Sequence, residues 1–308
     1  MSVPPEAESL RQNPETGRKP PWLKIKLPTS PAFFGVAETL ERKGLHTICR
    51  SARCPNRSEC WSEKTATFLI LGDRCTRQCA FCAVAKGRPE PPAADEPTRV
   101  AEAAAALGLA YAVVTSVTRD DLPDGGAAHF AATIRELRRL SPGIRVEALV
   151  PDFNGDKEAL DAVLETRPEI LNHNLEAPET IYPRLNRPPG NYGRSLRVLE
   201  RAARAGFETK SGLMIGLGET EEDIARTLRD LRGASCGLLT LGQYLRPGRE
   251  QAEVARYYNP EDFDLWKLKA LGLGFRAVEA GPLVRSSYHA RRMHGGLEAV
   301  QGMHPCAT

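Results

Sequence analysis

The chain has 308 residues, of which 41% are hydrophobic and 26% are charged, as expected for a globular protein with a substantial core. Its formal net charge of +3 is too small to indicate a nucleic-acid-binding surface, although it is compatible with an acidic protein partner. The longest uncharged stretches, residues 103–118 and 233–245, are shorter than a membrane-spanning helix, so we expect no membrane segment.

The N-terminal region, residues 1–30, is rich in proline and charge and lacks the apolar core of a secretory signal. We therefore expect a mobile, extended segment at the start of a cytoplasmic protein. In a reducing compartment, eight cysteines with six of them between residues 49 and 82 favour metal binding over disulfides.

Residues 31–64 form the next region, with a helical pattern at 32–44 followed by three cysteines. From residue 65 onward, strand and helix patterns alternate. Apolar runs predict strands at 66–72, 111–117, 144–151, 169–176, 208–218, 236–245 and 275–284. Helical spacing and caps predict helices at 100–109, 127–140, 157–166, 192–206, 220–233 and 260–274.

About six strand–helix units between residues 65 and 284 predict an α/β fold with a parallel sheet. A partial (β/α)6 barrel, TIM-like but incomplete, and an open doubly wound sheet both fit this alternation. In either fold, functional groups gather at the carboxyl ends of the strands. Residues 285–308 form a short C-terminal segment.

Cys75, Cys79 and Cys82 follow the first of these strands with the spacing Cys-x3-Cys-x2-Cys. Closely spaced thiolates on a loop can hold zinc or an iron–sulfur cluster. Zinc normally takes four protein ligands, so a zinc site would need a distant Cys236 or Cys306. Three ligands around a four-iron cluster leave one iron open to a small molecule, and the spacing favours this interpretation.

Upstream, Cys49, Cys54 and Cys60 form another triplet, with the spacing Cys-x4-Cys-x5-Cys. Because the spacing differs from that of the downstream loop, we interpret it as a second site of its own. We call Cys49, Cys54 and Cys60 the first triplet, and Cys75, Cys79 and Cys82 the second triplet.

The second triplet, with Phe81 before its last cysteine, resembles the loop of radical S-adenosylmethionine enzymes. In that superfamily the open iron binds S-adenosylmethionine, whose reductive cleavage gives a radical that abstracts hydrogen from unactivated carbon. Both triplets together with "RSSYHA" at 285–290 resemble the lipoyl synthase family. Further similar stretches, within a resemblance that covers residues 19–290, are "VTSVTRDDLPDGGA", "LNHNLE", "KSGLMIGLGE" and "GQYLRP".

This resemblance implies a partial (β/α)6 barrel with two 4Fe–4S clusters and insertion of sulfur at carbons 6 and 8 of a protein-bound octanoyl chain. The second triplet would hold the radical-generating cluster. The first triplet would hold an auxiliary cluster together with Ser287, or less favourably Ser286. A serine oxygen is a harder ligand than thiolate, so such a cluster could be opened to supply the sulfur.

The same resemblance implies contacts to S-adenosylmethionine at the end of the fourth strand. Asn174 and Glu176 would bind the ribose hydroxyls. From its position on the strand at 208–218, Lys210 is a further candidate contact, and packing at the edge of the core is the equally favoured alternative for it. Without the resemblance, "LNHNLE" also fits a polar strand end that caps the next helix. Gly216 and Gly218 would allow the backbone to approach a ligand closely.

Three acidic residues, Asp120, Asp121 and Asp124, follow the second strand. Their Pro-Asp-Gly-Gly context fits a solvated turn, whereas the family pattern places them in the cofactor pocket. Cys236 opens a buried strand and is expected in the core.

The expected partners are octanoylated lipoyl-carrier domains, namely E2 subunits of 2-oxoacid dehydrogenases and the glycine cleavage H protein, and a low-potential electron donor such as flavodoxin or ferredoxin. The basic stretch with Arg18, Lys24 and Lys26 could contact an acidic carrier. Alternative functions are a biotin synthase-like or methylthiotransferase-like enzyme, a two-cluster electron carrier and a zinc-binding interaction module.

Overall fold

The computed structural model describes residues 19–25, 27–63, 65–291 and 293. The expectations for residues 1–18, Lys26 and Cys306 therefore fall outside the described residues. A single eight-stranded sheet forms the centre of the protein, in the order β1-β2-β5-β6-β7-β8-β9-β10. Its strands are β1 (His46–Thr47), β2 (Thr67–Ile70), β5 (Tyr111–Ser116), β6 (Arg145–Leu149), β7 (Ile170–Asn172), β8 (Glu208–Ile215), β9 (Leu238–Gln243) and β10 (Ala277–Gly281).

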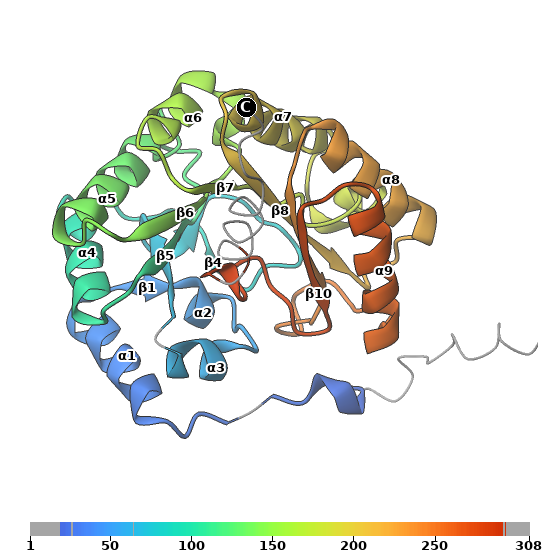
Figure 1. Ribbon diagram of the computed structural model, residues 1–308, viewed down its shortest axis with the longest axis horizontal. Helices are drawn as coiled ribbons and strands as arrows, with labels where there is room; N and C mark the ends of the chain where they lie inside the picture. Colours follow the sequence, from blue (N-terminus) through green and yellow to red (C-terminus); the bar gives the residue numbers. More distant parts are fainter. Residues whose placement is uncertain (1–18, 26, 64, 292, 294–308) are drawn as a thin grey trace, which may run out of the picture.

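All neighbouring strands from β2 to β10 are parallel, and only β1 pairs antiparallel, with β2. The crossover helices are α4 (Glu96–Ala106), α5 (Ala127–Leu140), α6 (Lys157–Leu164), α7 (Gly190–Arg204), α8 (Glu221–Gly233) and α9 (Pro260–Gly272). They surround the curved sheet on its outer side (Figure 1). The predicted partial (β/α)6 barrel is confirmed, with β10 as an additional parallel strand.

The residue patterns explain these layers. Every residue of β2 and β9 is buried, as expected where both faces of a parallel strand are covered. On α5, Phe130, Ile134 and Leu137 repeat at helical spacing and are fully buried. Thr220 begins α8 with a capping box that also uses Asp223. None of the helices among the described residues combines the length and apolar character needed to cross a membrane.

The first triplet lies on short elements that periodicity could not predict. After η3 (Pro21–Leu23) and α1 (Pro31–Arg42), the chain forms α2 (Ile48–Ser51) and α3 (Arg57–Ser62). Figure 1 shows these helices together beside one end of the sheet. Trp61 of α3 is buried against Phe33 of α1, with ring centroids 5.2 Å apart, so the small helices are anchored by aromatic packing.

The second triplet lies on the loop after β2. The short strands β3 (Arg74–Cys75) and β4 (Ala85–Lys86) pair with each other and join the two ends of this loop. Two 3-10 helices, η4 (Phe153–Gly155) and η5 (Glu179–Leu185), follow β6 and β7.

The C-terminal segment returns to the barrel after β10. Ala290 is buried in one cluster with Tyr111 and Val113 of β5. Met293 is buried in another cluster with Ile170 and Leu238. The described part of this segment therefore packs against the strands, and the serines before it are held close to the sheet.

Candidate active site

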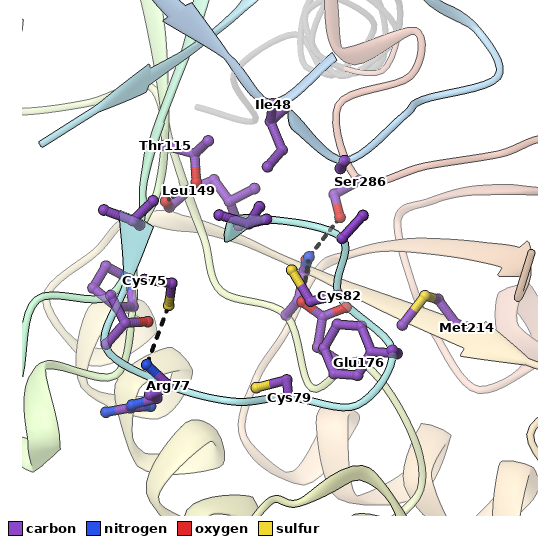
Figure 2. A pocket seen from close by; sticks show the side chains of 18 of the residues that line it. Ile48, Cys75, Arg77, Cys79, Cys82, Thr115, Leu149, Glu176, Met214 and Ser286 are labelled. Carbon is purple, nitrogen blue, oxygen red and sulfur yellow. Dashed lines mark hydrogen bonds between the residues drawn. The ribbon is translucent and has the colours of Figure 1, made fainter. Parts of the chain in front are cut away.

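A cavity of about 810 Å³ opens at the carboxyl ends of the parallel strands. Residues that follow β5, β6, β7 and β9 line it, as do the loop after β2 and the C-terminal segment. Figure 2 shows these side chains facing one shared space. This is the end of the barrel where the sequence predicts functional groups.

Both triplets belong to this cavity. All seven described cysteines are free thiols. Of the six in the triplets, five line the cavity, namely Cys49, Cys54, Cys75, Cys79 and Cys82. Cys60 is half-buried on α3, and its thiol lies close enough to Cys54 and Cys49 to be influenced by their charges. Segments that are separate in the sequence thus present two groups of thiols to one space.

The first triplet contains one buried cysteine, Cys49, whereas the other five triplet cysteines are half-buried. Burial, followed by the charge of Cys49, raises the pKa of Cys54 to about 11, while the nearby Arg285 guanidinium acts in the opposite direction. Burial and the neighbouring thiols likewise raise the pKa of Cys60. Three thiolates could not share this environment without a compensating positive charge, which an iron–sulfur cluster would supply.

The second triplet shows the same crowding on a more exposed loop. Burial raises the pKa of Cys82 to about 12, and the charges of Cys79 and Cys75 act in the same direction. Among the described residues, no group of three or more His, Cys, Asp and Glu side chains is arranged to hold a single metal ion. A four-iron cluster binds each cysteine through a different iron, so its ligands stand further apart than those of one ion. The donor sets fit such clusters.

Arg77, inside the second triplet, fastens this loop to the strand ends. Its guanidinium donates to Asp120 at 2.8 and 2.9 Å, to Asp152 at 2.6 Å and to Asn154 at 3.0 Å. Burial opposes ionisation of Asp152, but the hydrogen bond and charge of Arg77 hold its pKa at about 2. The backbone N–H of Arg77 also contacts the Cys75 sulfur at 3.4 Å, as Figure 2 shows. Sequence reasoning missed this residue because its partners follow other strands.

Asn174 and Glu176 line the cavity beside the second triplet. The Asn174 amide donates to Glu176 at 3.2 Å and to the Ser286 hydroxyl at 2.6 Å. Its Oδ1 atom is buried without a hydrogen-bond partner. Burial raises the pKa of Glu176, although the charge of Arg187 lowers it. An unused amide oxygen and a carboxylate short of donors together fit a ligand that carries hydroxyl groups.

His173 is a second residue that sequence reasoning missed. Its ring is almost fully buried and lines the cavity. Nδ1 lies 2.8 Å from the Val150 carbonyl, which can only accept, so the proton is on Nδ1. Nε2 is buried without a partner, and burial lowers the pKa of the ring to about 4. His173 therefore presents a neutral acceptor at the site.

Lys210 lies elsewhere. It is fully buried inside the barrel, where its ammonium group contacts both carboxylate oxygens of Glu147 at 3.1 and 3.2 Å. The same carboxylate accepts from Tyr111 and Asn172. Lys210 is absent from the cavity lining, so the geometry does not support it as a cofactor contact. Its side chain balances a buried charge instead.

The two glycines expected beside a ligand are also absent from that lining. Both have positive φ angles, 104° at Gly216 and 103° at Gly218. A Cβ at Gly216 would lie 2.2 Å from Gln243 and 2.5 Å from the Arg256 carbonyl, so glycine is needed there for packing within the protein.

Of the three aspartates, only Asp120 lines the cavity. Asp121 pairs with Arg119, and Asp124 accepts backbone N–H groups at the start of α5. Cys236 is fully buried in the core, as predicted, and is absent from the cavity lining.

Comparisons with known proteins agree with this geometry. Residues 69–231 match the Radical SAM superfamily, and residues 5–54 match the N-terminal domain of lipoyl synthase of the Radical SAM family. The lipoyl synthase of Rubrobacter xylanophilus is 52% identical over 297 residues, covering 94% of this chain and 92% of the relative. That of Caldanaerobacter subterraneus subsp. tengcongensis is 52% identical over 277 residues, covering 89% and 96%.

Solved structures are similar in fold. Streptococcus suis SuiB bound to the precursor peptide SuiA has a TM-score of 0.53 at 11% identity, over 73% of this chain and 52% of that chain. This chain spans about half the length of SuiB, and at such low identity the likeness concerns the fold alone. The sequence relatives decide the family: the chain belongs to the lipoyl synthase family and is a sulfur-inserting radical S-adenosylmethionine enzyme.

Proposed function

We propose that this enzyme inserts two sulfur atoms, at carbons 6 and 8, into a protein-bound octanoyl chain, and that a cluster at the first triplet supplies them. One observation carries the proposal: thiols of both triplets line the same cavity. A site that activates carbon and a site that stores sulfur must both reach the same alkyl chain. A shared cavity satisfies that requirement.

The second triplet would hold one 4Fe–4S cluster, with S-adenosylmethionine bound beside it. When bound, this pair supplies a radical able to remove hydrogen from an unactivated carbon. Asn174 would accept from a ribose hydroxyl through its unpartnered Oδ1 atom, and Glu176 from another. Arg77 would hold the loop against Asp120 and Asp152.

The first triplet would hold the auxiliary 4Fe–4S cluster, with Ser287 as the fourth ligand. Ser286 and Ser287 both line the cavity, but the Ser286 hydroxyl already accepts from Asn174 at 2.6 Å. This leaves Ser287 as the better candidate. Arg285 supplies a nearby positive charge that favours the thiolate of Cys54. In this division, residues 31–64 carry the auxiliary site, residues 65–284 form the barrel and the segment from 285 closes the site.

Apolar side chains complete the space between the thiols. Ile48, Leu149 and Met214 line it (Figure 2), as do Val117 and Leu245. They suit an extended alkyl chain, because the transfer of such a chain from water to an apolar surface is favourable. Because the chain arrives on a protein, a lipoyl-carrier domain must rest on the rim, where the exposed Lys19 and Arg53 also line the cavity. We expect E2 subunits and the glycine cleavage H protein as carriers, and flavodoxin or ferredoxin as reductant.

The test uses anaerobically reconstituted enzyme with an octanoylated carrier peptide, S-adenosylmethionine and dithionite. We expect about eight iron and eight sulfide per chain, for two four-iron clusters. Mass spectrometry should detect a peptide that has gained two sulfurs, and chromatography should detect 5′-deoxyadenosine. Formation of 5′-deoxyadenosine without sulfur in the peptide would contradict the proposed substrate. Two zinc ions and no iron would contradict both cluster assignments.

A further inference from the structure

The two neighbouring serines of the C-terminal segment differ in their contacts. Ser286 accepts a hydrogen bond from Asn174 Nδ2 at 2.6 Å, across 112 positions of sequence. Figure 2 shows Ser286 pointing into the cavity, with a dashed line at its hydroxyl. No hydrogen bond from the Ser287 side chain is found within the described part of the chain. Ser286 is therefore hydrogen-bonded to a residue that follows β7, whereas Ser287 lines the cavity without a side-chain hydrogen bond to the described residues.

The Asn174 amide has one orientation that satisfies its neighbours. Glu176 carboxylate oxygens can only accept when ionised, so they select the nitrogen side of the amide, 3.2 Å away. The second N–H of the same nitrogen then points at Ser286. With both N–H groups used, the oxygen side is turned away from these partners, and it is the atom left buried and unpartnered.

The Asn174 amide and the Ser286 hydroxyl meet directly beside the backbone of β8. A Cβ atom at Gly212 of β8 would lie 2.7 Å from Asn174 Oδ1 and 2.9 Å from Ser286 Oγ. Only glycine leaves room there for these two groups to meet. The Gly212 carbonyl also accepts a hydrogen bond from the backbone N–H of Glu176 at 3.0 Å. In this way β8 holds the turn that carries Asn174 and Glu176.

We propose that Ser286 is a positioning residue for S-adenosylmethionine: its hydroxyl takes the second Asn174 N–H and thereby aims the amide oxygen at the ribose. The inference rests on the proposed function, because Asn174 contacts this ligand only if the ligand binds beside the second triplet. It assigns different roles to adjacent serines, Ser286 to the cofactor pocket and Ser287 to the auxiliary cluster. The C-terminal segment then supplies one residue to each of the two sites.

The experiment measures the dissociation constant of S-adenosylmethionine by anaerobic equilibrium dialysis, without reductant, on reconstituted enzyme. Removing one hydrogen bond in Ser286→Ala should weaken binding about three- to tenfold, while iron per chain stays at the native value. If alanine disturbs folding, the isosteric pair Ser286→Thr and Ser286→Val still tests the proposal. The Ser286→Thr variant keeps a hydroxyl and should bind S-adenosylmethionine more tightly than the Ser286→Val variant. Ser287→Ala is the matched control and should lose iron while keeping native affinity for the ligand.

A double-mutant cycle separates positioning from a general structural effect. In an Asn174→Ala background, Ser286→Ala should cause no further loss of affinity, because the residue through which it acts is gone. Native affinity in Ser286→Ala, or the same loss in both backgrounds, would overturn the inference. So would loss of iron in Ser286→Ala with normal iron in Ser287→Ala, which would make Ser286 the cluster ligand. If the native enzyme itself does not bind S-adenosylmethionine, the proposed function fails first.

Discussion

The two triplets are built in different ways around one cavity. The second triplet lies on a single loop after β2, and Arg77 within it hydrogen-bonds to residues that follow β5 and β6. The first triplet lies on and between the short helices α2 and α3, outside the parallel part of the sheet. The C-terminal segment reaches it from the far end of the chain, where the Tyr288 hydroxyl donates to Glu59 of α3 at 2.9 Å.

This difference suits two kinds of chemistry. A cluster that must survive many turnovers is best held by one loop on a rigid barrel. A cluster that gives up its sulfur has to open, and a site assembled from separate segments can open without disturbing the sheet. Local stability should therefore be lower around the first triplet.

Exchange of one cysteine in each triplet has the largest expected effect on activity. Cys79→Ala should abolish both 5′-deoxyadenosine formation and sulfur insertion, because the second triplet loses a ligand of the radical-generating cluster. Cys60→Ala should abolish sulfur insertion but leave 5′-deoxyadenosine formation. Each variant should lose about four iron per chain. The control is Cys236→Ala, which changes a cysteine in the core, and this variant should keep the native iron content. Loss of 5′-deoxyadenosine formation in Cys60→Ala would mean that the sites are not separate.

Replacement of His173 tests how burial at the shared cavity controls stability. The unfolded ring takes up a proton below pH 6.5, whereas burial lowers the folded pKa to about 4. Between these values only the unfolded state binds the proton, so the free energy of unfolding falls by about 3 kcal/mol as pH falls from 6.5 to 4. Urea titrations of His173→Gln should lack this fall. An unchanged pH dependence would show that other groups dominate.

Removal of the Arg77 side-chain charge tests the attachment of the second triplet. Asp152 is almost fully buried, so Arg77→Gln leaves it short of its main partner and should cost about 2–3 kcal/mol of unfolding free energy. Iron at the second triplet should also be lost more readily to a chelator than iron at the first. Arg139→Gln removes a comparable but solvent-exposed pair with Glu136, and it should leave the unfolding free energy almost unchanged because solvent screens the pair. Equal effects of the two substitutions would contradict the role of Arg77.

Loss of the Tyr288 hydroxyl should give the smallest effect and tests the attachment of the first triplet. Tyr288→Phe removes the hydrogen bond to Glu59 and should cost about 1 kcal/mol. Chelators should then remove iron from the first triplet faster, while the second triplet is unaffected. Tyr257, whose hydroxyl has no hydrogen bond among the described residues, supplies the control Tyr257→Phe. Faster loss at both triplets would indicate a general loosening instead.

The sequence predicts the barrel well because its signals are local. Buried strands, amphipathic helices and caps such as Thr220 each depend on a few neighbouring residues, and parallel crossovers follow from their alternation. It does not predict α2 and α3, which are too short for a period to be recognised. The cysteine spacings identify two separate sites because ligands within one loop are close in space whatever the rest of the chain does.

Contacts between distant strands were decided only by the tertiary structure. From the sequence, Lys210 is a candidate ligand contact because it lies on a strand near glycines. In the structure its ammonium group pairs instead with the Glu147 carboxylate, 63 positions away, inside the barrel. Asn174 meets Ser286, and Arg77 meets Asp152, for the same reason: the curvature of the sheet brings the ends of separate strands and the segments that follow them together. The sequence by itself determines which chemistry the chain can perform, since that depends on residue types at short spacing. The fold determines which polar groups remain free to perform it, because a buried charge or amide takes whichever partner the packed strands place beside it.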